Sequence, residues 1–105
     1  MAFLRLEIIT KIERNRAITI IKDAINSSEG WIADHKLFSN NSASLTFEIP
    51  AKAIDPFLLK LDANGFKPEI IGDKPLISKG DIRCGLAITF VHNDPDMKRD
   101  VPPFG

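Results

Sequence analysis

The stretch WIADHKLFSNNSASLTFEIP, residues 31–50, contains two runs of strand-forming residues on either side of the turn cluster Ser-Asn-Asn-Ser. Apolar and polar residues alternate in both runs, which predicts a β-hairpin with strands over residues 31–38 and 43–49. A three-residue loop over residues 39–41 brings the apolar rows of both strands onto one face. The facing pairs are then Leu37 with Ala43, His35 with Leu45, Ala33 with Phe47, and Trp31 with Ile49.

A two-residue loop gives this hairpin a different register. It sets Lys36 opposite Leu45 and Asp34 opposite Phe47, because a shift by one residue turns every side chain of a strand to the other face. We therefore expect the three-residue loop, with Asn41 in the left-handed conformation that tight hairpin loops often require.

The residues before the hairpin predict one strand and one helix. Apolar side chains alternate with charged ones over residues 3–10, which indicates a half-buried strand. Over residues 13–28 the apolar period changes to that of an amphipathic helix, and Gly30 follows as a left-handed stop. The expected buried face of this helix consists of Ala17, Ile18, Ile21, Ala24 and Ile25.

A second helix is expected after the hairpin, over about residues 51–64. Proline is tolerated only in the first turn of a helix, so the regular part is expected to start with Asp55 as its cap and Pro56 at the first helical position. The expected apolar stripe of this helix consists of Ile54, Phe57, Leu58 and Leu61.

The rest of the chain predicts a short extended segment over residues 66–71, a loop over 72–81 and a last strand over 82–92. Strand, helix, strand, strand, helix, strand is the order of a ferredoxin-like α+β sandwich. Such a βαββαβ fold has a four-stranded antiparallel sheet with two helices on one face. We expect this ferredoxin-like domain to cover residues 1–93, followed by a Pro-rich C-terminal tail over 94–105.

Composition excludes several classes of partner. The chain has 105 residues, which fits one domain, and Lys plus Arg equal Asp plus Glu at 14 each. A balanced charge argues against nucleic acid and against a polybasic membrane contact. The first residues do not resemble a signal peptide, and no run approaches the roughly 20 apolar residues of a spanning helix. A single cysteine, Cys84, fits a reducing compartment, so we expect a cytoplasmic protein with no nucleic-acid or membrane partner.

The predicted arrangement leaves one face of the sheet without helices. Charged residues such as Arg5, Glu7, Asp34 and Lys36 share this face with apolar ones. Apolar patches rimmed by charge are typical of self-association surfaces, and a solvated face with scattered apolar residues is the plain alternative. We expect a homodimer, with Asp34 and Lys36 on an edge strand where charge discourages uncontrolled pairing. The expected interface residues are Phe3, Ile9, Ile32, Phe38 and Val91.

Residues that could carry chemistry are few. Cys84, His35 and His92 are fewer than the ligands of a structural zinc site, and no nucleophile or phosphate-binding motif occurs, so neither metal nor cofactor is expected. Cys84 has the apolar parity of its strand and is expected to be a small buried hydrophobe. Either histidine is a candidate ligand-binding or proton-transfer group, with simple packing as the alternative. Lys74 and Lys79 could bind an anion in loop 72–81, which is otherwise a solvated connector.

The order of elements resembles that of ACT-like regulatory domains over residues 3 to about 92. Such domains bind small ligands, often amino acids, between paired domains, so the resemblance implies a dimer with a ligand at its seam. The glycine-containing turn after the first strand is absent, because residues 11–15 are Lys-Ile-Glu-Arg-Asn, and no ligand residue carries over. Acylphosphatase shares the fold, but its glycine-rich turn and following arginine are absent too. Residues 31–40 and 47–50 resemble small bacterial proteins of unassigned function.

These observations favour a non-enzymatic, ACT-like dimerising module with a small ligand at the dimer seam or beside loop 72–81. One alternative is a protein-interaction adaptor that contacts its partner through the Pro-rich tail. The other is a small enzyme that uses His35 or His92 with a nearby carboxylate such as Asp34 or Asp94.

Overall fold

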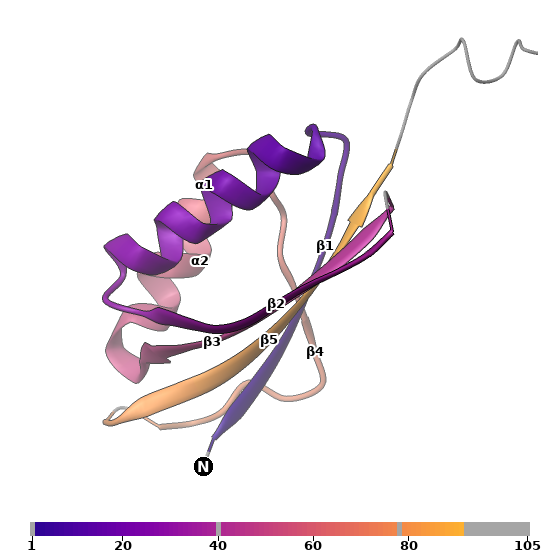
Figure 1. Ribbon diagram of the computed structural model, residues 1–105. Helices are drawn as coiled ribbons and strands as arrows, with labels where there is room; N and C mark the ends of the chain where they lie inside the picture. The colour runs from indigo at the N-terminus through magenta and orange to yellow at the C-terminus, as the bar shows by residue number, and fades with distance from the viewer. Residues whose placement is uncertain (1, 40, 78, 92–105) are drawn as a thin grey trace, which may run out of the picture.

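The computed structural model describes residues 2–39, 41–77 and 79–91 of the chain. Two helices cover one side of a single twisted sheet (Figure 1). The elements in chain order are β1 (Phe3–Thr10), α1 (Arg14–Ser27), β2 (Trp31–Ser39), β3 (Ser42–Pro50), the 3₁₀ helix η1 (Ala51–Ala53), α2 (Ile54–Ala63), β4 (Glu69–Ile71) and β5 (Asp81–Phe90).

The order of the strands in the sheet is β2-β3-β5-β1-β4. Strands β1 and β5 are parallel, and the other neighbours are antiparallel. The predicted ferredoxin-like fold with its four-stranded antiparallel sheet is therefore wrong, although the chain is α+β and has two helices. The sheet has five strands in the described residues and is mixed, and β5 lies at its centre.

Strand β4 accounts for this difference in topology. It pairs with β1 on the outer side, with Arg5 opposite Ile71 and Glu7 opposite Glu69. Because β4 occupies that side of β1, β5 pairs with the other side and separates β1 from β3. Alternation in a sequence identifies a strand but not its neighbours, so the position of β5 between β1 and β3 could not be read from it.

The hydrophobic core lies between the two helices and the sheet. Every second residue of the three central strands points into it, and the five residues predicted as the buried face of α1 are all buried. The ring of Phe57 on α2 packs edge-on against that of Phe47 on β3, with centroids 5.4 Å apart. The buried strand residues are Leu4, Leu6, Ile8 and Thr10 on β1, Ala43, Leu45, Phe47 and Ile49 on β3, and Ile82, Cys84, Leu86, Ile88 and Phe90 on β5.

The C-terminal end of helix α1 differs from the prediction in which residue has the left-handed conformation. Glu29, and not Gly30, adopts the left-handed conformation, with φ of 65°. The amide of Gly30 donates to the carbonyl of Ile25 at 2.9 Å. A Cβ atom at Gly30 would lie 2.8 Å from the carbonyl oxygen of Glu48. Glycine is therefore needed here for the close approach of β3, and not for a positive φ.

Helix α2 also starts differently from the prediction. Its N-cap is Ala53 and its first residue is Ile54, so Asp55 is not the cap and Pro56 lies inside the first turn rather than at the first position. Proline is accepted there because the amides of the first turn have no partner within the helix. The predicted stripe is confirmed: Ile54, Phe57 and Leu61 are buried and Leu58 is partly buried.

The β2–β3 hairpin follows the predicted register in its middle and departs from it at both ends. His35 faces Leu45 and Leu37 faces Ala43, as predicted. An irregularity at Ala33 shifts the register, so Ile32 faces Phe47 and Trp31 faces Glu48. The pairs Ala33–Phe47 and Trp31–Ile49 are thus wrong, since a bulge adds one residue to one strand. Toward the turn, Ser39 pairs with Ser42, so the predicted loop over 39–41 is one residue too long.

Candidate functional site

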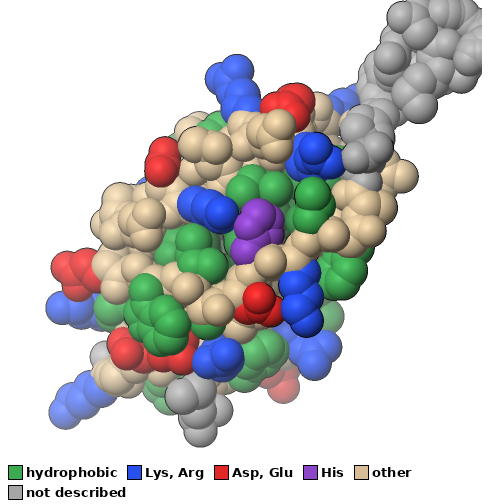
Figure 2. Space-filling model, in the orientation of Figure 1, with side chains coloured by type: hydrophobic (Ala, Val, Ile, Leu, Met, Phe, Trp, Pro, Cys, Tyr) green, Lys and Arg blue, Asp and Glu red, His purple; other side chains and the backbone are tan. Residues whose placement is uncertain are grey.

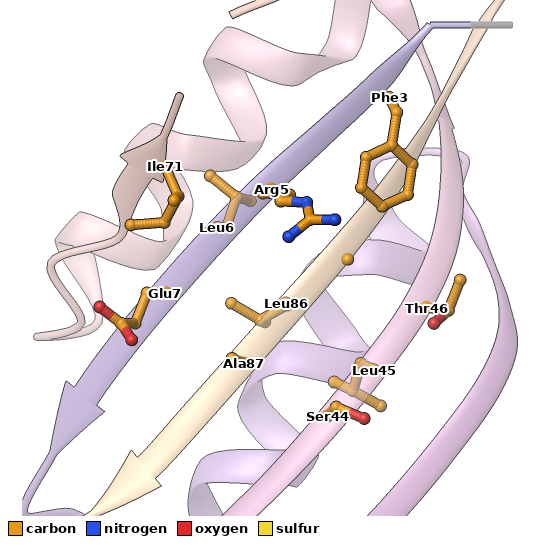
Figure 3. A pocket seen from close by; sticks show the side chains of 11 residues that line it. Phe3, Arg5, Leu6, Glu7, Ser44, Leu45, Thr46, Ile71, Leu86 and Ala87 are labelled. Carbon is orange, nitrogen blue, oxygen red and sulfur yellow. The ribbon is translucent and has the colours of Figure 1, made fainter. Parts of the chain in front are cut away.

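No helix of the described residues covers the second face of the sheet (Figure 1). The register places Arg5 and Glu7 of β1, Gly85 and Ala87 of β5, and Ser44 and Thr46 of β3 side by side across this face. The middle row has almost no side chain, because one of its residues is glycine and the other alanine. The two flanking rows are therefore separated by a trough that runs along β5 (Figure 3).

The trough has a volume of about 260 Å³. Ile71 of β4 closes it on one side of β1, and the hydroxyl-bearing residues of β3 border it on the other (Figure 3). The lining residues are Phe3, Arg5, Leu6, Glu7, Ser44, Leu45, Thr46, Ile71, Gly85, Leu86 and Ala87. A hollow with an apolar floor and a few polar groups at its rim is the usual form of a small-molecule site.

One end of the trough is formed by the ring of Phe3. A Cβ atom at Gly85 would lie 3.1 Å from Cζ of Phe3, so the absence of a side chain on β5 lets this ring lie over the strand. The guanidinium carbon of Arg5 lies 5.7 Å from the centre of the same ring. A cation at this distance is attracted by the face of an aromatic ring, which holds the Arg5 side chain beside the trough.

Some charged side chains around the trough form ion pairs and others do not. Arg83 and Glu48, which face each other at one end, form an ion pair of 2.8 Å. The ion pairs found within the described ranges include neither Arg5 nor Glu7. Arg5 extends from β1 toward β5, while Glu7 points to the β4 side (Figure 3). The trough therefore presents one guanidinium that no carboxylate of the described chain neutralises.

His35 lies apart from this trough. It is exposed on β2, which is an edge strand as predicted, and its backbone amide donates to the carboxylate of Asp34 at 3.0 Å. His92 lies outside the described residues, as does the tail over 94–105. The pairing of a histidine with Asp94 is therefore not part of the described structure, and His35 does not line the trough.

The loop after β4 carries the two lysines predicted to bind an anion. The ammonium group of Lys74 forms an ion pair with the carboxylate of Asp55 on α2. This ion pair holds the loop against the first turn of α2, and the charge of Lys74 is neutralised by Asp55. Lys79 is exposed and lies beside Ser78, which is outside the described residues.

The predicted interface residues lie in different surroundings. Phe3 and Ile9 are exposed on the open face, Phe38 is exposed on β2, and Val91 is exposed just after β5. Ile32 was expected on the open face and is not there. The bulge at Ala33 turns it to the helix side, where it packs against the core.

Cys84 is buried within the core, as predicted. Burial raises the pKa of its thiol to about 12, because a thiolate would lose its hydration there. No group of three or more His, Cys, Asp and Glu side chains suited to a metal ion occurs in residues 2–39, 41–77 and 79–91. Neither helix of the described chain is long and apolar enough to cross a bilayer.

Comparisons of the chain with protein-family models, with curated proteins and with solved structures gave no match in any of the three.

The sequence placed Arg5 and Glu7 on the open face, where they lie, but did not identify them as part of a site. Gly85 was the available signal, since glycine inside a strand often marks a close approach of another group. The trough could not be predicted, because Gly85 lies between β1 and β3 only in the observed strand order.

Proposed function

We propose that this chain is a binding module that holds a small carboxylate ligand with an apolar or aromatic body in the open-face trough. The observation that carries this proposal is the Arg5 guanidinium at the rim, which lies beside an apolar floor and has no carboxylate partner in the described chain. A guanidinium forms two parallel hydrogen bonds with a carboxylate, which gives both energy and orientation.

The body of the ligand would lie along β5. Gly85 and Ala87 leave the floor open, and the ring of Phe3 offers a face against which a second ring can stack. Ser44 and Thr46 contribute hydroxyl groups that can donate to or accept from polar substituents. Glu7 lies on the same strand as Arg5 and would disfavour a second negative charge on the ligand.

The size of the trough supports a small ligand. Its volume of about 260 Å³ is below the roughly 300–1,000 Å³ of sites that take drug-sized molecules. An amino acid or an arylalkanoic acid matches this size better than a nucleotide does.

Isothermal titration calorimetry with phenylacetate tests the proposal. Its neutral analogue phenylacetamide has nearly the same shape and is the matched control ligand. We expect phenylacetate to bind at least tenfold more tightly, since hydrogen bonds to charged groups contribute about 1.5–3 kcal/mol. At tenfold excess over Kd, ligand binding adds about 1.4 kcal/mol to the free energy of unfolding, which a thermal melt detects.

Three variants locate the site. Arg5→Gln removes the charge and should weaken phenylacetate binding about tenfold or more, and Gly85→Val fills the floor and should abolish it. Arg16→Gln removes an exposed arginine on α1, across the sheet from the trough, and should leave binding unchanged. Absence of binding by any aryl or alkyl carboxylate, or equal affinity in the wild type and Arg5→Gln, would refute the proposal.

A further inference from the structure

The outer edge of the sheet at β2 is exposed along almost its whole length. Trp31, Leu37 and Phe38 are 54%, 50% and 65% exposed, so three of the ten exposed large hydrophobic side chains of the described residues lie on this one strand. Figure 2 shows apolar side chains in green around a histidine on this side of the molecule, with charged side chains among them. Such a mixture is typical of an interaction surface.

Both sides of β2 are accessible to a partner. His35 and Leu37 have the helix-side parity, since they face the buried residues Leu45 and Ala43, yet both are exposed. The helices therefore leave that side of β2 uncovered at residues 35 and 37, whereas Ile32 at the start of the strand packs against the core. A strand added opposite residues 34–37 would therefore meet an exposed part of this edge.

The charges of β2 are arranged so that the strand complements itself. Asp34 and Lys36 lie on either side of His35, and they share the open face of the sheet, opposite Thr46 and Ser44. Two copies of β2 that pair antiparallel with His35 on the two-fold axis set each Asp34 opposite Lys36 of the second copy. Opposite charges in facing positions stabilise an antiparallel pair, and like charges destabilise it.

The neighbouring registers lack this match. An axis at Asp34 sets two carboxylates opposite each other, and an axis at Lys36 sets two ammonium groups opposite each other. An unrelated strand that lacks matching charges gives Asp34 and Lys36 no facing partner, which is how charged edges discourage uncontrolled pairing. The same two residues therefore select a second copy of β2 in one register.

We propose that two copies of this chain associate through β2, antiparallel and with His35 on the two-fold axis, so that their two five-stranded sheets join into one. The backbone amide of each His35, which donates to its own Asp34 in the single chain, donates instead to the carbonyl of His35 in the second copy. In the single chain Asp34 also lies 3.9 Å from Lys36 of its own strand, and in the dimer it pairs instead with Lys36 of the second copy. This contact leaves the open-face trough uncovered and does not rest on the proposed ligand.

Charge reversal with rescue tests this register. Sedimentation equilibrium of the full chain should show a monomer–dimer equilibrium. The symmetric dimer contains two facing Asp34–Lys36 pairs. Asp34→Lys and Lys36→Asp should each raise the dimer Kd about tenfold or more, because each turns both of these opposite-charge pairs into like-charge pairs. The double variant Asp34→Lys/Lys36→Asp restores the facing pairs and should return Kd to within about threefold of the wild type.

Matched controls make the same charge changes elsewhere. Asp23→Lys on α1 and Lys67→Asp after α2 are exposed, and neither should change the dimer Kd more than about twofold. Circular dichroism checks that each variant is folded. Trp31 is the single tryptophan, so its emission should shift to shorter wavelength as the wild type dimerises.

Hydrogen exchange of the wild type gives a second, variant-free readout. The amides of His35 and Leu37, which point to the free edge, should exchange more slowly at concentrations where the dimer forms. A chain that stays monomeric at about 1 mM would overturn the proposal. So would a dimer insensitive to both single reversals, a dimer that the double variant does not restore, or unchanged exchange of the amides of His35 and Leu37.

Discussion

Replacing Gly30 by alanine is the change for which the structure gives the most specific stability prediction. The added Cβ atom would lie 2.8 Å from the carbonyl oxygen of Glu48, 3.0 Å from Cγ2 of Ile25 and 3.2 Å from the carbonyl oxygen of Ile25. Two of these three atoms belong to the backbone of β3 and α1. They cannot move by a change of rotamer, so the helix and the strand must separate to admit the methyl group.

The size of the effect follows from two opposing terms. Overpacking a well-filled site costs typically 1–3 kcal/mol, and contacts with backbone place Gly30→Ala in the upper part of that range. Replacing glycine also reduces the entropy of the unfolded chain, which returns about 0.4–1 kcal/mol. We expect a net loss of about 2 kcal/mol, or a decrease in Tm of roughly 8–16 °C for a domain of this size.

Urea denaturation followed by circular dichroism measures this loss. Gly85→Ala is the matched control, because its Cβ would approach only the end of the Phe3 side chain, at 3.1 Å, and that ring is about half exposed and can move. We expect Gly85→Ala to change the free energy of unfolding by no more than about 0.5 kcal/mol. If Gly30→Ala is no less stable than Gly85→Ala, the proposed close approach of β3 to the end of α1 is wrong.

Three further predictions concern the core, the helix cap and the cysteine. Phe57→Ala should lower the free energy of unfolding by about 3–5 kcal/mol in urea denaturation, because Phe57 is fully buried against Phe47. Hydrogen bonds from the amides of Asn15 and Arg16 lower the pKa of Glu13 from its ordinary 4.5, so the carboxylate stabilises the fold above pH 4.5 and loses this effect as the pH falls through its lowered pKa. Glu13→Gln should therefore be less stable than the wild type at pH 7, with a difference that shrinks below pH 4.5 in thermal melts. With the pKa of Cys84 raised from 9.0 to about 12, alkylation by iodoacetamide at pH 8 should be roughly a thousandfold slower in the native protein than in urea; equal rates would contradict its burial.

The helices and their buried faces were predictable because their signal is local. The five residues expected to face the core from α1 all do so, and the stripe of α2 is buried as expected. Details of the helix ends were less predictable. Gly30 lies close to the backbone of β3, and Glu29 before it has the left-handed conformation that glycine normally favours.

The β2–β3 hairpin shows where a local pattern stops being sufficient. Its central pairs were predicted because both apolar rows must share one face. The bulge at Ala33 was not, because a uniform alternation contains no sign of an extra residue. That one residue reverses the positions of Trp31 and Ile32, so Ile32 joins the core and Trp31 faces the open side.

The candidate site was only partly accessible to sequence reasoning. Arg5 was placed correctly on the open face, since the face of a residue follows from its parity. Its role depends on Gly85 and Ala87 being the next row, and that adjacency joins residues about 80 positions apart in the chain.

By itself the sequence determined the α+β class, the position of the helices and main strands, and the side of each element that is buried. These properties follow from periodicity over a few consecutive residues, because burial of an apolar row is favourable in any topology. Only the tertiary structure decided the strand order β2-β3-β5-β1-β4, the parallel pair at its centre and the trough above Gly85. Strand order depends on which distant segments pair with the two sides of β1, and here β4 pairs with one side and β5 with the other.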